Sequence, residues 1–197
     1  MNDRDLEWEA VKTEHLVQDA YIDFRRMTYR LPDGTVFGPY YNYTRRNYVV
    51  IVAMTPEGDY LCVRQFRHGI RQVTCEFPAG GIETEGDYDY QMPAQPDVSV
   101  EDALDAAKRE LQEETGYQSQ EWQHLLTIPS NATMADNYGY LYLATNCRKV
   151  SGQHLDDTEF LNVELLSGEE IEKRIQNGEF QQAMHVLAYE LSRKMLK

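Results

Sequence analysis

Three features that would each mark a particular class of protein are scarce or missing in this chain. Its 197 residues include only three cysteines, Cys62, Cys75 and Cys147. They show no CxxC or CxxH spacing, so neither a zinc site nor a disulfide framework is indicated, and we expect all three to be small core residues. No apolar run approaches the length of a membrane span, and the charged N-terminus lacks the apolar segment of a signal peptide. We therefore expect a cytoplasmic protein with no membrane partner.

Positive charge is scarce as well. Lysine and arginine total 19 against 33 aspartates and glutamates, which gives a net charge of -14. A general nucleic-acid surface needs a basic field, so we expect no nucleic-acid partner. Phosphate chemistry is not excluded, because divalent metal ions can invert the local potential. None of His68, His124, His154 and His185 is spaced i,i+4 from another, and each is interpreted as a surface or core residue.

What is present is a mixture of strand and helix patterns without strict alternation. Strands are predicted at 21–30, 35–44, 47–55, 60–66, 73–81, 122–128, 138–145 and 159–166, and helices at 99–116, 168–176 and 181–196. The strand at 73–81 is expected to break at Pro78 and the two glycines that follow. The first two strands form an antiparallel hairpin around a turn at 31–34. The acidic stretch 82–100 is interpreted as an exposed loop. This mixture predicts an α+β fold in which a mixed sheet lies between helices.

The first predicted helix carries the most informative residues. Ser99 begins it, with an acid three residues later that approximates a capping box, and Gly116 is a candidate C-cap. Leu104, Ala107 and Leu111 recur at the spacing of a core stripe. We therefore expect this helix to pack on the sheet and to end at the glycine.

Glutamates crowd the end of this helix, where residues 109–117 read "RELQEETGY". The negative end of the helix dipole disfavours acids there, and Glu110 and Glu114 repel each other at i,i+4. On a helical wheel they project together with Glu113, at the edge of the core. Hard divalent cations prefer carboxylate oxygens, so a metal site is the functional interpretation. Taken alone, the cluster would be interpreted as a solvated acidic face.

At this point the chain resembles the Nudix hydrolases, whose signature is G-x5-E-x7-R-E-U-x-E-E-x-G-U with U a bulky apolar residue. Two parts of the chain match that signature: Glu101 and, after seven intervening residues, the run 109–117. The resemblance implies an α/β/α sandwich with a mixed sheet. It also implies that the first acid pairs with Arg109, so that Glu101, Arg109 and Gly116 have structural roles.

The signature is interrupted in this chain. Residues 82–100 separate Gly81 from Glu101, whereas the family has five residues there. If five residues, 82–86, follow Gly81 as in the family, the acidic position of the signature is Asp87. The first acidic position is therefore filled either by Glu101 or by Asp87.

Two further segments resemble one branch of the family, the ADP-ribose and nucleoside-diphosphate-sugar pyrophosphatases. They are "VRQFRHG" at 63–69 and "EFPAGG" at 76–81. The resemblance implies a substrate-binding set of Arg67, Glu76, Gly80 and Gly81. Arg67 would grip the diphosphate through its planar fork. A strand-edge surface arginine is an equal alternative for this residue.

The resemblance also implies a metal centre. Its ligands would be Glu110, Glu113, Glu114 and the carbonyl of Ala79, holding Mg²⁺ with Mn²⁺ as a possible substitute. Such ions lower the pKa of a bound water. Glu159 is the candidate to position or deprotonate that water, with Asp156 and Asp157 close behind. An ordinary exposed acid is the alternative for Glu159.

By the same resemblance, residues 1–46 form an antiparallel β lobe for dimerisation and base binding. Residues 47–197 form a Nudix hydrolase domain with an inserted loop around 82–100. The aromatic hairpins of the lobe are too small to make a core of their own, so we expect a homodimer.

The expected function is Mg²⁺-dependent hydrolysis of a nucleoside diphosphate linked to a sugar-like group, with ADP-ribose cleaved to AMP and ribose 5-phosphate as first choice. Another nucleotide-sugar or a dinucleotide is the alternative, because residues 129–137 lack the Ser-Pro-Gly that the branch often carries. A triphosphate is disfavoured, since no second arginine was found to meet its charge. A non-catalytic nucleotide-binding regulator is the competing class, but all three glutamates of the signature are retained.

Overall fold

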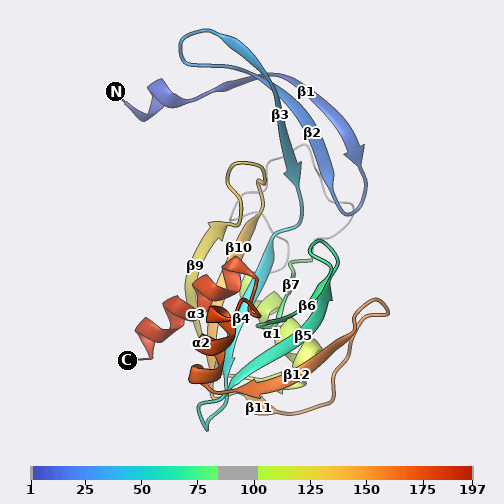
Figure 1. The fold of residues 1–197 in the computed structure, drawn as a ribbon, viewed down its shortest axis with the longest axis vertical. Helices are drawn as coiled ribbons and strands as arrows, with labels where there is room; N and C mark the ends of the chain where they lie inside the picture. Colours follow the sequence, from blue (N-terminus) through green and yellow to red (C-terminus); the bar gives the residue numbers. More distant parts are fainter. Residues whose placement is uncertain (1, 84–101, 197) are drawn as a thin grey trace.

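Three β-sheets and three α-helices occur in the part of the chain that the computed structural model describes, residues 2–83 and 102–196 (Figure 1). The strands are β1 (Glu9–Gln18), β2 (Asp23–Arg30), β3 (Val36–Thr44), β4 (Tyr48–Met54), β5 (Tyr60–Arg67), β6 (Gln72–Glu76), β7 (Ala79–Gly81), β8 (Tyr117–Gln118), β9 (Glu121–Pro129), β10 (Tyr138–Thr145), β11 (Arg148–Lys149) and β12 (Leu161–Leu166). The helices are α1 (Ala103–Thr115), α2 (Gly168–Gln176) and α3 (Ala183–Met195), and a short 3-10 helix, η1, spans Asp3–Leu6.

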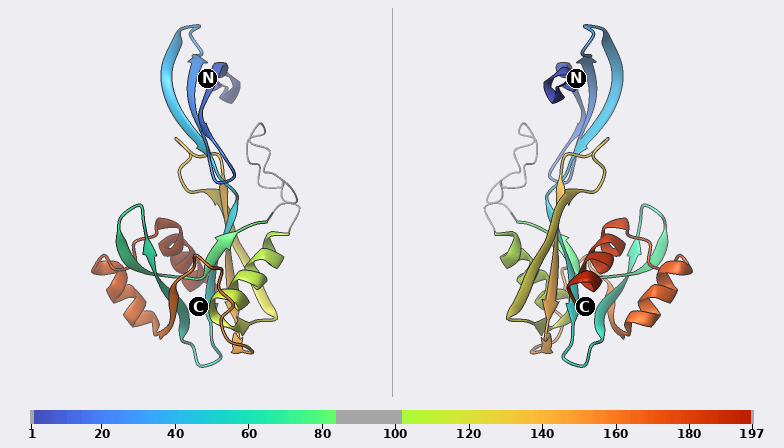
Figure 2. Two further views of the ribbon diagram at one scale, coloured as in Figure 1. Left: turned by 90° about the vertical axis from the view of Figure 1, so that its right-hand side faces the viewer. Right: turned by 90° about the vertical axis from the view of Figure 1, so that its left-hand side faces the viewer.

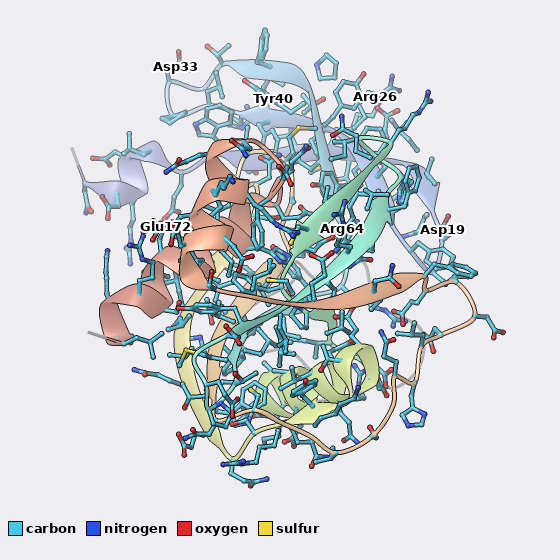
Figure 3. The ribbon with its side chains drawn as sticks, turned by 60° about the horizontal axis from the view of Figure 1, so that its bottom comes forward. Asp19, Arg26, Asp33, Tyr40, Arg64 and Glu172 are labelled. Atoms are coloured by element: carbon cyan, nitrogen blue, oxygen red, sulfur yellow. The ribbon has the colours of Figure 1, made fainter. Side chains whose placement is uncertain are left out.

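Strands β1, β2 and β3 form an antiparallel sheet, here called the N-terminal sheet, that projects from the rest of the molecule (Figure 1). The predicted hairpin of β2 and β3 is present, whereas β1 was not predicted. Aromatic rings pack against Tyr40, which Figure 3 labels on this sheet. Tyr29 and Phe37 meet it edge to face, and Trp8 lies tilted against it and edge to face with Tyr29. The sheet is therefore held together by cross-strand contacts instead of by a second layer of structure.

The second sheet, here called the central sheet, has seven strands in the order β12-β5-β4-β10-β9, with β6 paired to β5 and β7 to β4. Strand β10 runs parallel to β4, and the other pairs are antiparallel. Strand β4 is apolar along its length because both of its faces are covered. Val49 and Ile51 belong to the core beneath α1, while Val50 and Val52 belong to the core beneath α2 and α3. Figure 2 shows the sheet between these helices.

This architecture confirms the predicted α+β sandwich with a mixed sheet and a small antiparallel sheet at the N-terminus. The predicted strand 73–81 breaks at Pro78, as expected, into β6 and β7, and the two glycines belong to β7. Helix α1 begins later than predicted, because Asp102 is its N-cap and accepts from the backbone of Leu104. Ser99 and most of the predicted loop lie outside the described residues. All three cysteines are buried and free, as predicted.

Strands β4 and β5 diverge, and this divergence places the cleft described below. They pair only through Ala53 and Met54 of β4, whereas Tyr48, Val49 and Val50 of β4 pair with β7. The end of β5, the short strand β7 and the start of β4 therefore surround one opening. Among residues 2–83 and 102–196, none of the helices has the length and apolar character needed to span a bilayer.

Candidate active site

Helix α1 presents its glutamates against β7 because its end is fixed by Gly116. This glycine has φ of 76°, in the left-handed region, and donates its N–H to the carbonyl of Gln112. A Cβ at this position would overlap the backbone carbonyl of Ser151. Only glycine therefore allows both the left-handed cap and the close passage of the loop that follows β11.

Glu110 and Glu114 lie buried against the glycine-rich strand β7. Only 7% of Glu110 and 3% of Glu114 is exposed. The backbone N–H of Ala79 donates to Glu114 Oε2 over 3.0 Å. A Cβ added at Gly80 would overlap the carboxyl group of Glu110, so the helix and the strand can approach this closely only with glycine at position 80.

Two buried carboxyl groups so close together resist ionisation. Burial raises the pKa of Glu110 to about 7, although the positive charge of Arg109 opposes this shift. Burial also raises the pKa of Glu114 well above its ordinary value, and the charge of Glu110 adds to the effect. Desolvation and a neighbouring like charge both penalise the ionised form. A cation bound beside the pair would reverse this penalty.

Glu113 is placed differently from its two neighbours. Its side chain is 40% exposed and accepts a hydrogen bond from Arg109 Nη1 over 2.8 Å. The same nitrogen lies 3.0 Å from Glu110 Oε1, and Arg109 Nη2 donates to the carbonyl of Gly81. Arg109 therefore ties the end of α1 to β7. Glu101 and Asp87, the two candidates for its acidic partner, lie outside the described residues.

The oxygens at this junction suit a divalent cation. Carboxylate and carbonyl oxygens are the ligands that hard ions prefer. Because the N–H and C=O of one strand residue point to the same edge, the Ala79 carbonyl faces α1 as its N–H does. In the described part of the chain, however, no three His, Cys, Asp or Glu side chains already form a ligand set. The structure thus brings Glu110, Glu114 and Ala79 together and leaves Glu113 with Arg109.

Glu159 lies in the loop between β11 and β12, close enough that its negative charge raises the pKa of both Glu110 and Glu114. Its carboxylate accepts from the backbone N–H of Asp156 over 3.1 Å, and its own N–H donates to the Asp156 carbonyl. Glu159 therefore has a defined place beside the buried pair, whereas Asp156 and Asp157 are exposed.

Arg67, the last residue of β5, is paired with Glu76 of β6 through two nitrogens. Its Nε and Nη2 donate to Glu76 over 2.9 and 2.8 Å. Glu76 is completely buried and also accepts from Thr74, so it reaches the cleft only through Arg67. The Arg67 side chain is 34% exposed.

A cleft of about 640 Å³ opens beside these residues, between the N-terminal sheet and the central sheet. Its lining includes Arg67, Ala79, Gly80 and Gly81, together with Ala20, Tyr21, Tyr43, Arg45, Arg46, Tyr48, Ser130, Asn137, Gln182, Ala183, Met184 and His185. The expectation that no second arginine accompanies Arg67 was therefore wrong, because Arg45 and Arg46 line the same cleft. They come from the segment that joins the two sheets, and sequence motifs centred on 63–81 gave no signal for them.

The joining segment is held in place by the loop between β9 and β10. Tyr43 exchanges backbone hydrogen bonds with Met134 and Asp136. Asp136 also accepts from Arg25 and Thr44 of the N-terminal sheet over 2.8 and 2.6 Å. These contacts orient the two arginines that follow Thr44 toward the cleft.

Comparison with known proteins identifies the arrangement. The family model of the NUDIX domain matches residues 44–185. The chain belongs to the Nudix family. As predicted, it is a pyrophosphohydrolase of that family. Nudix enzymes generally use divalent metal ions, which agrees with the oxygen ligands gathered at β7.

Three relatives and one solved structure place this Nudix protein more closely. It is 30% identical over 149 residues to an ADP-ribose pyrophosphatase of Mycobacterium tuberculosis, covering 73% of this chain and 62% of the relative. It is 25% identical over 183 residues to an ADP-ribose pyrophosphatase of Bacillus subtilis, covering 89% and 87%. It is 27% identical over 182 residues to the methanol dehydrogenase activator of Bacillus methanolicus, covering 86% of each. A crystal structure of an ADP compounds hydrolase, 18% identical, shares the fold with a TM-score of 0.78 over 97% of this chain and 95% of that one.

Proposed function

We propose that the protein hydrolyses the pyrophosphate bond of ADP-ribose to AMP and ribose 5-phosphate, with Mg²⁺ as the metal ion and Mn²⁺ as a possible substitute. The observation that carries this proposal is the cleft, whose lining brings arginines and tyrosines together with Ala79 and Gly80, the residues of β7 on which the buried pair Glu110 and Glu114 packs. The two relatives named ADP-ribose pyrophosphatase support this choice of substrate.

Substrate binding is assigned to the lining of the cleft. Arg67, held by Glu76, presents its remaining N–H groups to the diphosphate, and Arg45 and Arg46 add positive charge in a chain of net charge -14. Tyr43 and Tyr48 offer rings on which a base can stack. Gly80 and Gly81 let the backbone approach the substrate closely.

Catalysis is assigned to the end of α1 and to the loop before β12. What a bound divalent ion supplies is charge neutralisation at the phosphates and a water of lowered pKa. Glu110, Glu114 and the Ala79 carbonyl would hold that ion, with Glu113 joining them on leaving Arg109. Glu159 would accept a proton from the attacking water, whose oxygen bonds to one phosphorus while the bond between that phosphorus and the bridging oxygen breaks, and the bridging oxygen leaves with the other phosphate.

The proposal is tested by comparing kcat/KM for ADP-ribose, GDP-mannose, a diadenosine polyphosphate and dGTP in Mg²⁺, with the products identified. ADP-ribose should be cleaved fastest, because the lining offers sites for one base and one diphosphate. A tenfold preference for dGTP or the dinucleotide, about 1.4 kcal/mol in transition-state binding, would overturn the substrate assignment. The Nudix chemistry would survive that result.

We also propose that the N-terminal lobe, residues 1–46, makes the protein a homodimer. The N-terminal sheet buries only Asp23, Met27 and Thr44 along its three strands, while Trp8 and Phe37 are 48% and 55% exposed. A single-layer sheet with exposed apolar residues is marginal alone and is typical of an interaction surface. A second copy of the chain would cover it.

A second candidate function is activation of a dehydrogenase. Its support is the Bacillus methanolicus relative, which is named a methanol dehydrogenase activator and matches over most of both chains. Retention of Glu110, Glu113 and Glu114 favours hydrolysis as the activity on which any such effect would depend. Loss of ADP-ribose hydrolysis in Glu114→Gln, together with retained activation of a dehydrogenase, would separate the two functions.

A further inference from the structure

His185, in the first turn of α3, lies at the back of the cleft. Only 5% of its side chain is exposed, yet the residue belongs to the lining of the cleft beside Arg67 and Ala79. Its Nδ1 accepts the backbone N–H of Phe77 over 3.1 Å. An imidazole that accepts at Nδ1 in its neutral form carries its proton on Nε2. The contact with Phe77 therefore fixes Nε2 as a donor.

The ring is kept neutral by its surroundings. Burial lowers the pKa of His185 to about 3, and the positive charge of Arg67 acts in the same direction. At physiological pH the imidazole is thus an uncharged group with one donor and one acceptor in fixed positions.

The donor at Nε2 has no acceptor within hydrogen-bonding distance among residues 2–83 and 102–196. Its nearest charged neighbour is Glu76 Oε2 at 3.9 Å, which is too far for a hydrogen bond. Both oxygens of Glu76 are already used by Arg67 and Thr74. Because His185 lines the cleft and its Nε2–H donates to no group in the described residues, this N–H is suited to an acceptor that enters the cleft.

We propose that His185 binds the substrate, donating its Nε2–H to an oxygen of the diphosphate group held by Arg67. Arg67 uses Nε and Nη2 for Glu76, so its other nitrogen is available beside the imidazole. Two donors, one charged and one neutral, then face the same anionic group. This inference rests on the proposed function in one respect, that the ligand contains a diphosphate.

Two variants separate this role from a structural one, because each keeps a different half of the imidazole. His185→Asn places an amide oxygen near the position of Nδ1 and removes the donor at Nε2. His185→Gln places an amide N–H near the position of Nε2 and removes the acceptor for Phe77. Both are compared with the wild-type full chain in EDTA, by calorimetric titration with ADP, inorganic pyrophosphate and adenosine.

We expect His185→Asn to bind ADP and pyrophosphate about ten- to a hundredfold more weakly, the range for a hydrogen bond to a charged group, and to bind adenosine as the wild type does. His185→Gln should bind ADP within about threefold of the wild type but melt at a lower temperature, because the Phe77 N–H loses its acceptor. In the wild type, the Nε2–H resonance of His185 should move on addition of pyrophosphate.

Wild-type binding of ADP by His185→Asn would overturn the inference, as would weaker binding by His185→Gln alone or no binding of pyrophosphate by the wild type. An equal loss of adenosine and ADP binding in both variants would also overturn it, since that indicates a packing role. If the wild type shows the expected binding but does not cleave ADP-ribose, the proposed function fails and the inference stands. If ADP-ribose is cleaved with unchanged KM by His185→Asn, the inference fails and the function stands.

Discussion

The N-terminal sheet and the central sheet bury very different shares of their side chains, although the strands of the N-terminal sheet are about as long as the longest of the central one. Residues Val49 to Ala53 of β4 are all fully buried, because helices cover both faces of the central sheet. Strand β1, by contrast, has no buried residue along its ten positions. The central sheet contains its own core, whereas the N-terminal sheet has almost none.

This difference separates stability from binding. The acids of the site stand on α1, packed against the central sheet, where a small displacement would disturb the core. The arginines and tyrosines of the cleft lie where the N-terminal sheet joins the central one, held by Asp136, Arg25 and Thr44. Substitutions in the central sheet should therefore affect chemistry and folding, and those in the N-terminal sheet should affect assembly and binding.

The largest effect on activity should come from Glu114→Gln, on the helix that packs against the central sheet. The variant keeps the shape of the side chain and removes a metal-binding charge. We expect kcat to fall at least about a hundredfold in Mg²⁺, with Glu113→Gln giving a similar loss, because the metal contributes several kcal/mol to the transition state. Steady-state kinetics and circular dichroism check this, with the exposed Glu57→Gln as a control of equal charge. Near-normal turnover in both variants would contradict the metal site.

A pH effect on stability is expected from Glu110 in the same region. The pKa of Glu110 is about 7 in the folded protein against 4.5 in the unfolded chain, so the folded state holds a proton that the unfolded state has released. The contribution of Glu110 to the stability of the metal-free protein is present below about pH 4.5 and is lost as pH rises to about 7, by up to about 3 kcal/mol. His185 acts in the opposite direction below about pH 6.5, because its pKa is lowered in the folded protein. The Glu110 contribution is therefore measured as the difference between the wild type and Glu110→Gln in denaturant unfolding in EDTA. The wild type should lose stability relative to the variant as pH rises from 4.5 to 7, and a constant difference would remove Glu110 as its cause.

A smaller effect is expected from the glycines of β7. In Gly80→Ala the new methyl group meets the Glu110 carboxyl, so we expect a loss of about 1–3 kcal/mol in the free energy of unfolding and a lower kcat. Gly81→Ala is the matched control, since a Cβ there meets nothing within 4 Å. Melting temperatures and kcat values of Gly80→Ala and Gly81→Ala test this prediction. Equal behaviour of the two variants would argue against close packing of α1 on β7.

The smallest change in stability is expected from substitutions in the N-terminal sheet. Their effect should instead be seen in the molar mass of the protein in solution, which reports whether it is a dimer. Light scattering of the wild type should give about twice 22.9 kDa. Phe37→Ser should shift this value toward the monomer, while the unfolding free energy of the monomer changes by about 1 kcal/mol or less, because the ring is more than half exposed. Val150→Ser serves as the control, because Val150 is similarly exposed and lies just after β11, outside the N-terminal sheet. A monomeric wild type at micromolar concentration would contradict the dimer.

Much of the central sheet was predictable because its signals are local. The apolar run of β4 and the core stripe of α1 follow from burial, and the glutamates and Gly116 stand at fixed spacing within one helix. Leu104, predicted as part of the core stripe, is only partly buried, and Ala103 and Ala106 are buried beside it. A helical wheel identifies which face of the helix is buried, but not how many residues wide that face is.

The remaining features depend on contacts between distant segments. Strand β1 has no buried face, so its sequence carries no alternation to detect. Arg45 and Arg46 reach the cleft only because Asp136 and its neighbours fix the joining segment. Arg67 pairs with Gln72 in the strand ladder, yet its guanidinium reaches Glu76, a pairing that strand register does not predict.

The left-handed turn at Gly116 has a consequence for motion. The carbonyls of Glu113, Glu114 and Gly116, which a helix end leaves without partners, accept from His154, Gln153, and Val150 and Ser151 respectively. These hydrogen bonds join the final turn of α1 to the loop leading to Glu159, so the two segments must open or shift as one unit. Their amides should exchange with solvent at a common rate, which would slow when a cation draws the carboxylates inward.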